Sequence, residues 1–292
     1  MNDFWIAVAL SVVSALCYGG GAVAQRRLAS LLNGRSRTRS ALRALLEQRL
    51  WWLSVALNAL GALLHAVALV YGALIVVQPL GTLTLVFALP WSAWLAGRRV
   101  GPREWHGAVL TVLALAVMLA TTSQDSSGHP LRDDSVPLVL LLTLAVLAVM
   151  GLAASRTAHP VRRSLLFAAA SGVAFGVASA LTKTVLTQFS LSGPMGLVDW
   201  SPVGLALLAC AGLLLSQAAY RDMGVGAPLA TMTLANPATA VVVGVVFMDE
   251  TYLAGVWGAG VSLLAGIVAV RGIVLLSTPE PAAPAPSLTS RR

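Results

Sequence analysis

The chain has 292 residues, of which 58% are hydrophobic and only 10% charged, and its mean hydropathy is +0.83. Because a soluble domain carries about 25% charged residues, this composition excludes an ordinary soluble protein and predicts an all-α, polytopic membrane helix bundle. The net charge of +8 does not indicate nucleic-acid binding, since the basic residues cluster between apolar runs and not along one polar face.

A membrane-spanning helix needs about 20 apolar residues. Nine segments of the chain qualify: 4–25, 50–71, 74–96, 105–121, 137–153, 165–187, 203–220, 227–248 and 253–275. The first is too long for the core of a signal peptide and has no basic residue before it, so we expect a retained span. The final stretch, 277–292, is rich in Pro and Ala, and we expect a disordered tail.

The arginines predict the orientation of these spans. The first loop, RRLASLLNGRSRTRSALRALLEQR, holds seven arginines and one glutamate. The positive-inside rule therefore places it in the cytoplasm and the N-terminus outside. With nine spans, all of the 19 basic residues except Arg132 and Lys183 then fall on the cytoplasmic side. We therefore predict a chain with its N-terminus out and its C-terminus in.

The chain also contains an internal repeat. An offset of 149 aligns Tyr71 with Tyr220, Pro79 with Pro228, Thr82 with Thr231 and Thr84 with Thr233, within VVQPLGTLTLVFALP and GAPLATMTLANPATA. An offset of 157 aligns Ser14 with Ser171, Tyr18 with Phe175, Gly19 with Gly176 and Arg26 with Lys183. We therefore divide the chain into a first half (1–121, spans one to four), a fifth span with its loops (122–163), a second half (164–276, spans six to nine) and the tail.

Corresponding spans are five apart, and because five is odd the two halves must cross the membrane in opposite directions. Such inverted-topology repeats are typical of secondary transporters, whose substrate site lies near the midplane between interrupted helices. Proline removes an intrahelical hydrogen bond, so the third and eighth spans are expected to be interrupted and to line the site. The candidate substrate-binding residues are His65, Gln78, Pro79, Thr82, Thr84, Pro228, Thr231, Thr233, Asn236 and Pro237.

Each candidate also has a simpler interpretation. His65 either contacts substrate or a coupling proton, or is a neutral imidazole bonded to a neighbouring helix; Asn58 lies on the same helix face, two turns away. Asn236 either binds substrate or caps a broken helix. The threonines often bond to the carbonyl four residues earlier. Cys17 and Cys210 are expected to be small buried hydrophobes.

The acidic residues give no clear metal site. Mg²⁺ prefers oxygen ligands, commonly one or two carboxylates, and none of the 11 acids lies at the centre of a predicted span. Asp222, Asp249 and Glu250 lie at span ends, as entry sites or as solvated loop charges. The sequence has no catalytic motif of the serine hydrolase, zinc peptidase or nucleotide-binding type, so we expect neither an enzyme nor a bound cofactor.

The segment from LEQRLWWLSVALNALG to WLAGRRVGPREWHGAVL resembles the drug/metabolite transporter superfamily, whose members are built from inverted repeats. More narrowly, the chain resembles the NIPA-like magnesium transporter branch. The shared features are a basic loop after the first span, a second span that begins with WW, a V-x-PLG-x-L third span (Val77 to Leu83) and nine spans in place of ten.

Membership of the superfamily implies a multi-pass protein of the cytoplasmic membrane that moves a small solute by alternating access, and the branch implies Mg²⁺. A hydrated ion would then be held by carbonyls freed near the prolines, with the threonines and Asn236. A small metabolite is equally open as the substrate, and a homodimer is possible. The alternative function is a structural or partner protein that has the same fold and does not transport.

Overall fold

The computed structural model describes residues 2–32, 41–71, 80–121, 131–132, 134–193, 200–248 and 255–277, and these residues form helices joined by turns, without strands. The helices are α1 (Asn2–Leu32), α2 (Ala41–Leu46), α3 (Arg49–Tyr71), α5 (Thr84–Leu95), α6 (Pro102–Ala120), α7 (Val136–Arg156), α8 (Pro160–Ser192), α9 (Trp200–Ala219), α10 (Gly226–Phe247) and α11 (Val256–Ser277). The tail lies outside the described residues.

The helices confirm a polytopic membrane bundle. In the described ranges, eight helices are long and apolar enough to cross a membrane, and a shorter apolar helix covers Leu80–Leu95. Together they fall on the nine predicted segments. Helices α1 and α8 extend beyond the predicted limits of the first and sixth spans, which are 4–25 and 165–187. A helix continues past the apolar run wherever its polar ends remain solvated.

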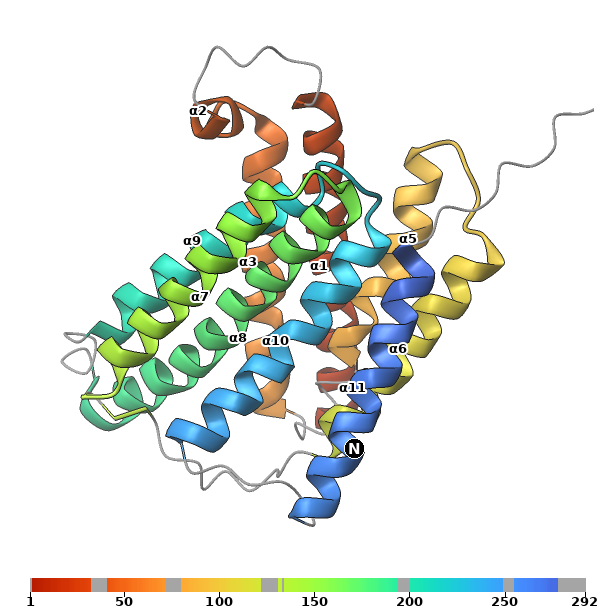
Figure 1. Ribbon diagram of the computed structural model, residues 1–292. Helices are drawn as coiled ribbons and strands as arrows, with labels where there is room; N and C mark the ends of the chain where they lie inside the picture. Colours follow the sequence, from red (N-terminus) through yellow and green to blue (C-terminus); the bar gives the residue numbers. More distant parts are fainter. Residues whose placement is uncertain are drawn as a thin grey trace, which may run out of the picture.

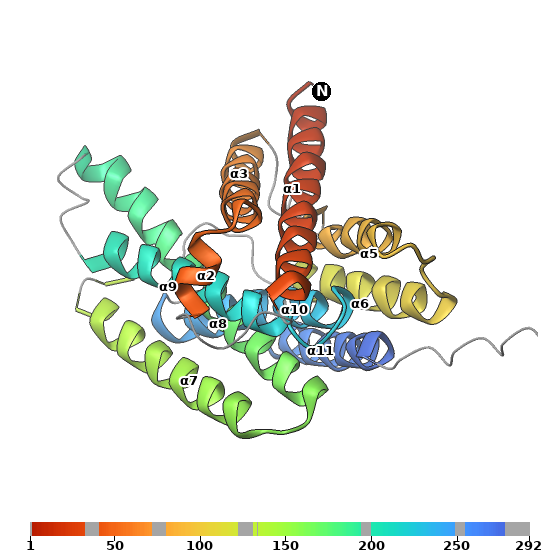
Figure 2. The same ribbon diagram turned by 90° about the horizontal axis from the view of Figure 1, so that it is seen from above.

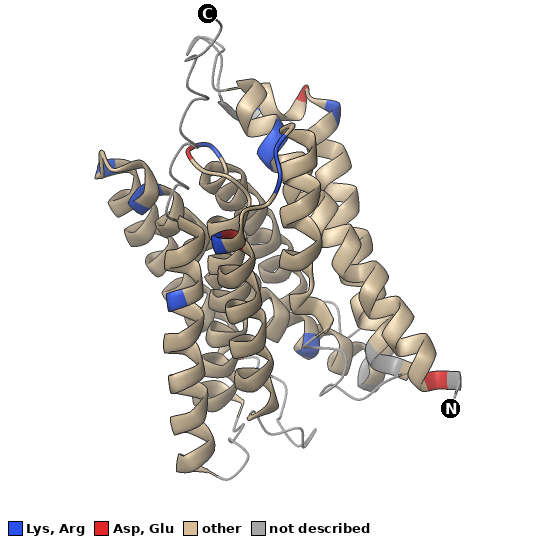
Figure 3. Ribbon diagram, turned by 90° about the vertical axis from the view of Figure 1, so that its right-hand side faces the viewer, with Lys and Arg blue, Asp and Glu red and all other residues tan. Residues whose placement is uncertain are grey.

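Successive long helices run in alternating directions (Figure 1). Helix α1 starts at the bottom of the view, α3 returns, and the alternation continues until α11 ends at the top. Each helix of the first half therefore runs opposite to its counterpart in the second half: α1 against α8, α3 against α9, α5 against α10, and α6 against α11. Figure 3 shows that most Lys and Arg residues gather at the end of the bundle where α1 and α11 finish, which we name the basic end.

Helix neighbours are similar in the two halves. Helix α1 packs on α3 and α5, and α8 packs on α9 and α10. Helix α6 packs along α11, and α7 covers the outside of α8 and α9 (Figure 2). The close approach of α6 and α11 depends on small residues, since a Cβ added to Gly107 would lie 2.8 Å from the Gly272 carbonyl oxygen.

One contact occurs in the same form in both halves. In the first half, the Ser14 hydroxyl donates to the Gly61 carbonyl over 2.7 Å, and a Cβ on Gly61 would lie 3.1–3.2 Å from the Tyr18 ring. The second half has the same serine-to-glycine bond between α8 and α9, with an aromatic ring over the glycine. That bond joins Ser171 and Gly212 over 2.8 Å, and the ring is that of Phe175.

The serines of these two contacts, Ser14 and Ser171, and the aromatic residues, Tyr18 and Phe175, are pairs that the offset of 157 aligns. The two glycines differ by 151, two more than the offset that aligns Tyr71 with Tyr220. An alignment that includes both the glycine pair and the tyrosine pair therefore needs a shift of two residues between them.

The structure corrects the expectation for the eighth span. Helix α10 is continuous from Gly226 to Phe247, so neither Pro228 nor Pro237 interrupts it. Pro228 is the third residue of α10. The backbone N–H groups in the first turn of any helix have no intrahelical partner, so the missing N–H of a proline there breaks no hydrogen bond. Pro237 removes one internal bond, which a membrane helix tolerates when its neighbours cover the freed carbonyl.

The third span does contain an irregularity in its described part. Residues 80–82 are helical, Leu83 is a turn, and α5 follows from Thr84. The Leu83 N–H bonds to the Leu80 carbonyl, three residues back, and not to one four residues back. The two spans therefore differ, with a tightened turn in one and an unbroken helix in the other.

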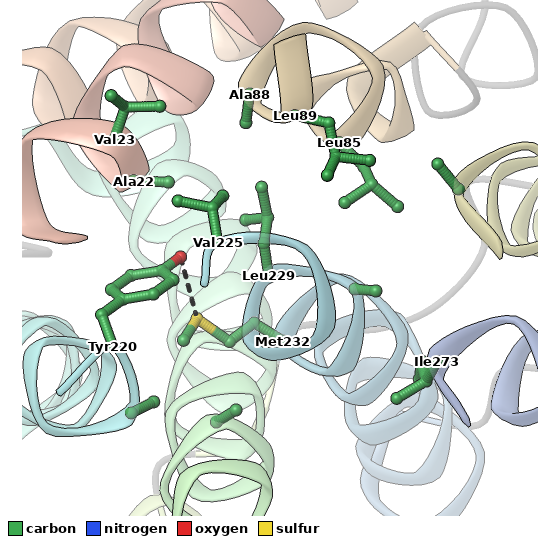
Figure 4. Packing of buried hydrophobic residues seen from close by; sticks show 14 of the residues in the cluster. Ala22, Val23, Leu85, Ala88, Leu89, Tyr220, Val225, Leu229, Met232 and Ile273 are labelled. Atoms are coloured by element: carbon green, nitrogen blue, oxygen red, sulfur yellow. Dashed lines mark hydrogen bonds between the residues drawn. The ribbon is translucent and has the colours of Figure 1, made fainter. Parts of the chain in front are cut away.

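A buried apolar cluster joins the halves near the basic end. Figure 4 shows Leu85 and Leu89 of α5 facing Leu229 of α10, with the Tyr220 hydroxyl directed at the Met232 sulfur, 3.9 Å away. The members of this apolar cluster are Ala22, Val23, Ala29, Leu85, Ala88, Leu89, Ala108, Ala168, Ala219, Tyr220, Val225, Leu229, Ala230, Met232 and Ile273.

Candidate functional site

The described candidates on α5 and α10 lie at similar heights beside the apolar cluster. The two helices meet where the Leu89 side chain would touch a Cβ on Gly226, at 3.2 Å. Counting about 1.5 Å per residue, Thr84 and Thr231 each lie about 7.5 Å from that point, away from the basic end. The threonine pairs of the two halves therefore occupy the same level of the bundle.

The hydroxyls of Thr231 and Thr233 each bond to the carbonyl four residues earlier, as their simpler interpretation predicts. Thr231 donates to the Ala227 carbonyl and Thr233 to the Leu229 carbonyl, both over 2.8 Å. Thr84 donates to the Gly81 carbonyl over 2.7 Å. Thr82 is buried. A hydroxyl that donates in this way still has lone pairs to accept a bond, so these oxygens can serve as acceptors for a solute.

His65 lies against the irregular start of the third span. A Cβ on Gly81 would lie 3.7 Å from His65 Cε1 and 3.9 Å from its Nδ1. The half-buried imidazole forms no hydrogen bond with any residue that the structure describes. Asn58, on the same face, donates to the Ser54 carbonyl and packs on Gly21.

Helix α8 packs closely against the backbone of α10 at Asn236. A Cβ on Gly176 would lie 2.5 Å from the Asn236 carbonyl oxygen, and one on Gly172 would lie 3.2 Å from its nitrogen. The side-chain amide is half-buried and has no hydrogen-bond partner in the described ranges. Because α10 is continuous, Asn236 does not cap a broken helix, and its amide is available to another molecule.

The candidates do not form one connected network. No hydrogen bond joins His65 to Asn236 among the described residues. Gln78 and Pro79 lie outside the described residues, as do Asp249 and Glu250. Asp222, one of the span-end acids, forms a two-pronged ion pair with Arg163, at 2.7 and 2.5 Å. In the part of the chain that the structure describes, no three His, Cys, Asp or Glu side chains gather as a metal site.

Sequence reasoning missed a polar contact between the halves. The Ser216 hydroxyl lies 3.0 Å from Gln25 Oε1, and Gln217 Nε2 donates to the Gln25 carbonyl over 3.0 Å. All three residues are at most 2% exposed. The prediction placed Gln25 at the last residue of the first span, 4–25, and did not single it out as a polar contact. The only feature of the sequence that could have indicated this contact is the position of Gln25 at the end of the first apolar run.

Comparisons with known proteins find a relative that matches almost the whole chain. The chain is 30% identical over 285 residues to an uncharacterized protein of Corynebacterium glutamicum, and the alignment covers 95% of this chain and 98% of that protein. No family model matches the chain, and no solved structure matches it. The chain belongs to the same family as this Corynebacterium glutamicum protein.

Proposed function

We propose that the protein is a secondary transporter that moves a small solute across the cytoplasmic membrane by alternating access between two inverted halves. The observation that carries this proposal is the repeated contact of Ser14, Gly61 and Tyr18 with its counterpart of Ser171, Gly212 and Phe175. Because the helices that hold these contacts run in opposite directions (Figure 1), an inverted repeat accounts for both observations together.

The proposed orientation has the N-terminus outside and the basic end in the cytoplasm. The gathering of Lys and Arg at one end of the bundle (Figure 3) supports it, since cytoplasmic ends carry the excess of positive charge. The candidate residues of α5 and α10 then lie on the external side of the apolar cluster. A solute would reach them from outside while the cluster closes the cytoplasmic end.

The resemblance to the NIPA-like branch of the drug/metabolite transporter superfamily suggests Mg²⁺ as the solute. The Asn236 amide oxygen and the hydroxyls of Thr84, Thr231 and Thr233 are hard oxygen ligands of the kind that suits a hydrated magnesium ion. The same groups would also hydrogen-bond a small polar metabolite, and the proposal keeps both solutes.

Uptake into proteoliposomes tests this function. The purified protein is reconstituted, and influx of Mg²⁺ is compared with that of an amino-acid panel and an amine panel, with and without a pH gradient. We expect His65→Ala and Asn236→Ala each to lower the rate by roughly tenfold, as loss of a hydrogen bond of about 1.5 kcal/mol predicts. His159→Ala, at an exposed loop position before α8, is the matched control.

Each outcome has a distinct meaning. Influx of an organic solute without Mg²⁺ influx would rule out the magnesium branch and keep the transport function. Wild-type rates in both variants would remove His65 and Asn236 from the site. No influx of any tested solute, from protein that inserts and remains folded, would favour the non-transporting structural alternative.

A further inference from the structure

We infer that Gln25, Ser216 and Gln217 form a latch that closes the basic end of the bundle and must separate for the site to open toward the cytoplasm. This inference rests on the proposed transport function. The latch joins α1 of the first half to α9 of the second half, beside the apolar cluster. We name these three residues the inner latch.

The inner latch is polar where an apolar contact would hold the halves more firmly. Gln217 Nε2 donates to the Gln25 carbonyl, but Gln217 Oε1 is buried without a hydrogen-bond partner among the described residues. Gln25 Nε2 reaches the Leu213 carbonyl only at 3.4 Å. A buried, unsatisfied acceptor offsets much of what the neighbouring hydrogen bonds contribute. The closed contact is therefore only weakly favoured, as a contact that must open and close requires.

Among the residues that the structure describes, the opposite end of the bundle lacks the equivalent contact. Under the offset of 157, Gln25 corresponds to Thr182 of α8, and under the offset of 151 shown by the two glycines, Ser216 corresponds to His65 of α3. Helix α1 packs on α9, whereas α8 and α3 are not a packed pair in the described ranges. Figures 1 and 2 show α8 and α9 spreading away from α1 and α3 toward the end where α1 starts.

This asymmetry defines two states. In the observed state the inner latch is formed, and Thr182 bonds only to the Ala178 carbonyl of its own helix, over 2.8 Å. In the other state the inner latch is separated, and Thr182 and His65 approach each other as the repeat-related contact. The same rearrangement exchanges the closed end of the bundle for the open one.

Thiol labelling tests the inner latch without any knowledge of the solute. Cys17 and Cys210 are first replaced by Ala, and a reporter, Thr233→Cys, is labelled with a membrane-impermeant maleimide in right-side-out and inside-out vesicles. We expect labelling from the outside in the parent protein. Gln25→Ala or Gln217→Ala should raise labelling from the cytoplasmic side at least fivefold.

The control is Gln48→Ala, which removes a glutamine in the turn between α2 and α3, at the same end of the bundle, and should leave labelling unchanged. Equal cytoplasmic labelling in the parent, control and latch variants would overturn the inference. Ser216→Ala provides a milder latch variant if a glutamine variant fails to fold, and it should shift labelling in the same direction.

A cross-link separates failure of the latch from failure of the transport proposal. Gln25→Cys and Gln217→Cys are combined in the cysteine-free protein and joined by a short bis-methanethiosulfonate reagent. We expect the cross-link to abolish cytoplasmic labelling of the reporter and to stop solute influx until a reductant is added. Undiminished influx through the cross-linked protein would refute the latch and leave transport established. A protein that moves no solute would still report the latch by its labelling.

Discussion

Gly176→Ala should destabilise the protein through a single added methyl group. The new Cβ would lie 2.5 Å from the Asn236 carbonyl oxygen and 2.7 Å from the Thr239 Cβ, whereas ordinary contact begins at 3.4 Å. Helices α8 and α10 must therefore separate by about 0.9 Å at this crossing. A gap of that size removes a quarter to a half of the attraction between facing atoms, and overpacking of this kind costs about 1–3 kcal/mol.

The stabilisation that alanine gives to a helix opposes this loss only in part. Replacing a helical glycine by alanine stabilises a helix by about 0.5–1 kcal/mol, so the net loss for Gly176→Ala is about 0–2.5 kcal/mol, with a midpoint of about 1.2 kcal/mol. At about 2–4 °C per kcal/mol, the midpoint of this loss lowers the Tm by about 2–5 °C. Gly266→Ala is the matched control, since a Cβ there would meet nothing within 4 Å, and its Tm should be unchanged or higher.

The assay is thermal denaturation of the purified protein in one detergent, followed by tryptophan fluorescence and by retention of the monodisperse peak. The two alanine variants carry the same chemical change, so detergent effects on them cancel. A Tm for Gly176→Ala that equals or exceeds that of Gly266→Ala would show that α8 and α10 do not approach as closely as the structure places them.

Two further predictions use the same measurement. Ser14→Ala and Ser171→Ala should each lower the free energy of unfolding by about 1 kcal/mol, because each removes the same kind of interhelical hydrogen bond. The control is Ser190→Ala, whose hydrogen bond is exposed. Unequal losses for the two buried serines would contradict the repeat. Pro228→Ala should change stability by less than about 0.5 kcal/mol, whereas Pro237→Ala should stabilise by about 1 kcal/mol or more. A loss of stability in Pro237→Ala would indicate that the proline shapes α10.

The sequence predicted the apolar helices well because their signal is local. Twenty consecutive apolar residues define a span whatever their neighbours are. The alignment of Ser14 with Ser171 and of Tyr18 with Phe175 was also informative, since the structure places both pairs in matching contacts. A repeat preserves contacts between helices, so its polar and aromatic positions carry information about packing.

The effect of proline was not predictable in the same way. The predicted limits of the eighth span, 227–248, already put Pro228 beside the start of the helix, but the expectation of an interruption did not use that position. Once α10 starts at Gly226, Pro228 falls in the first turn and disrupts nothing. The inner latch was missed for a different reason, because its partners are more than 190 residues apart in the chain and no local pattern relates Gln25 to Gln217.

Gly19 and Gly176, which the offset of 157 aligns, differ in how closely their helices pack against the neighbouring helix. A Cβ on Gly19 would meet the Thr84 carbonyl oxygen at 3.4 Å, an ordinary contact, whereas one on Gly176 would overlap the Asn236 carbonyl. Both helix pairs approach through backbone atoms, but α8 and α10 are closer together than α1 and α5, whose nearest backbone atoms lie 3.4–3.7 Å from the added Cβ. Helix α5 also begins beside the irregular turn at Leu83. If the halves move against each other, α8 and α10 move as one body, and the change of shape falls on α5 and on the inner latch.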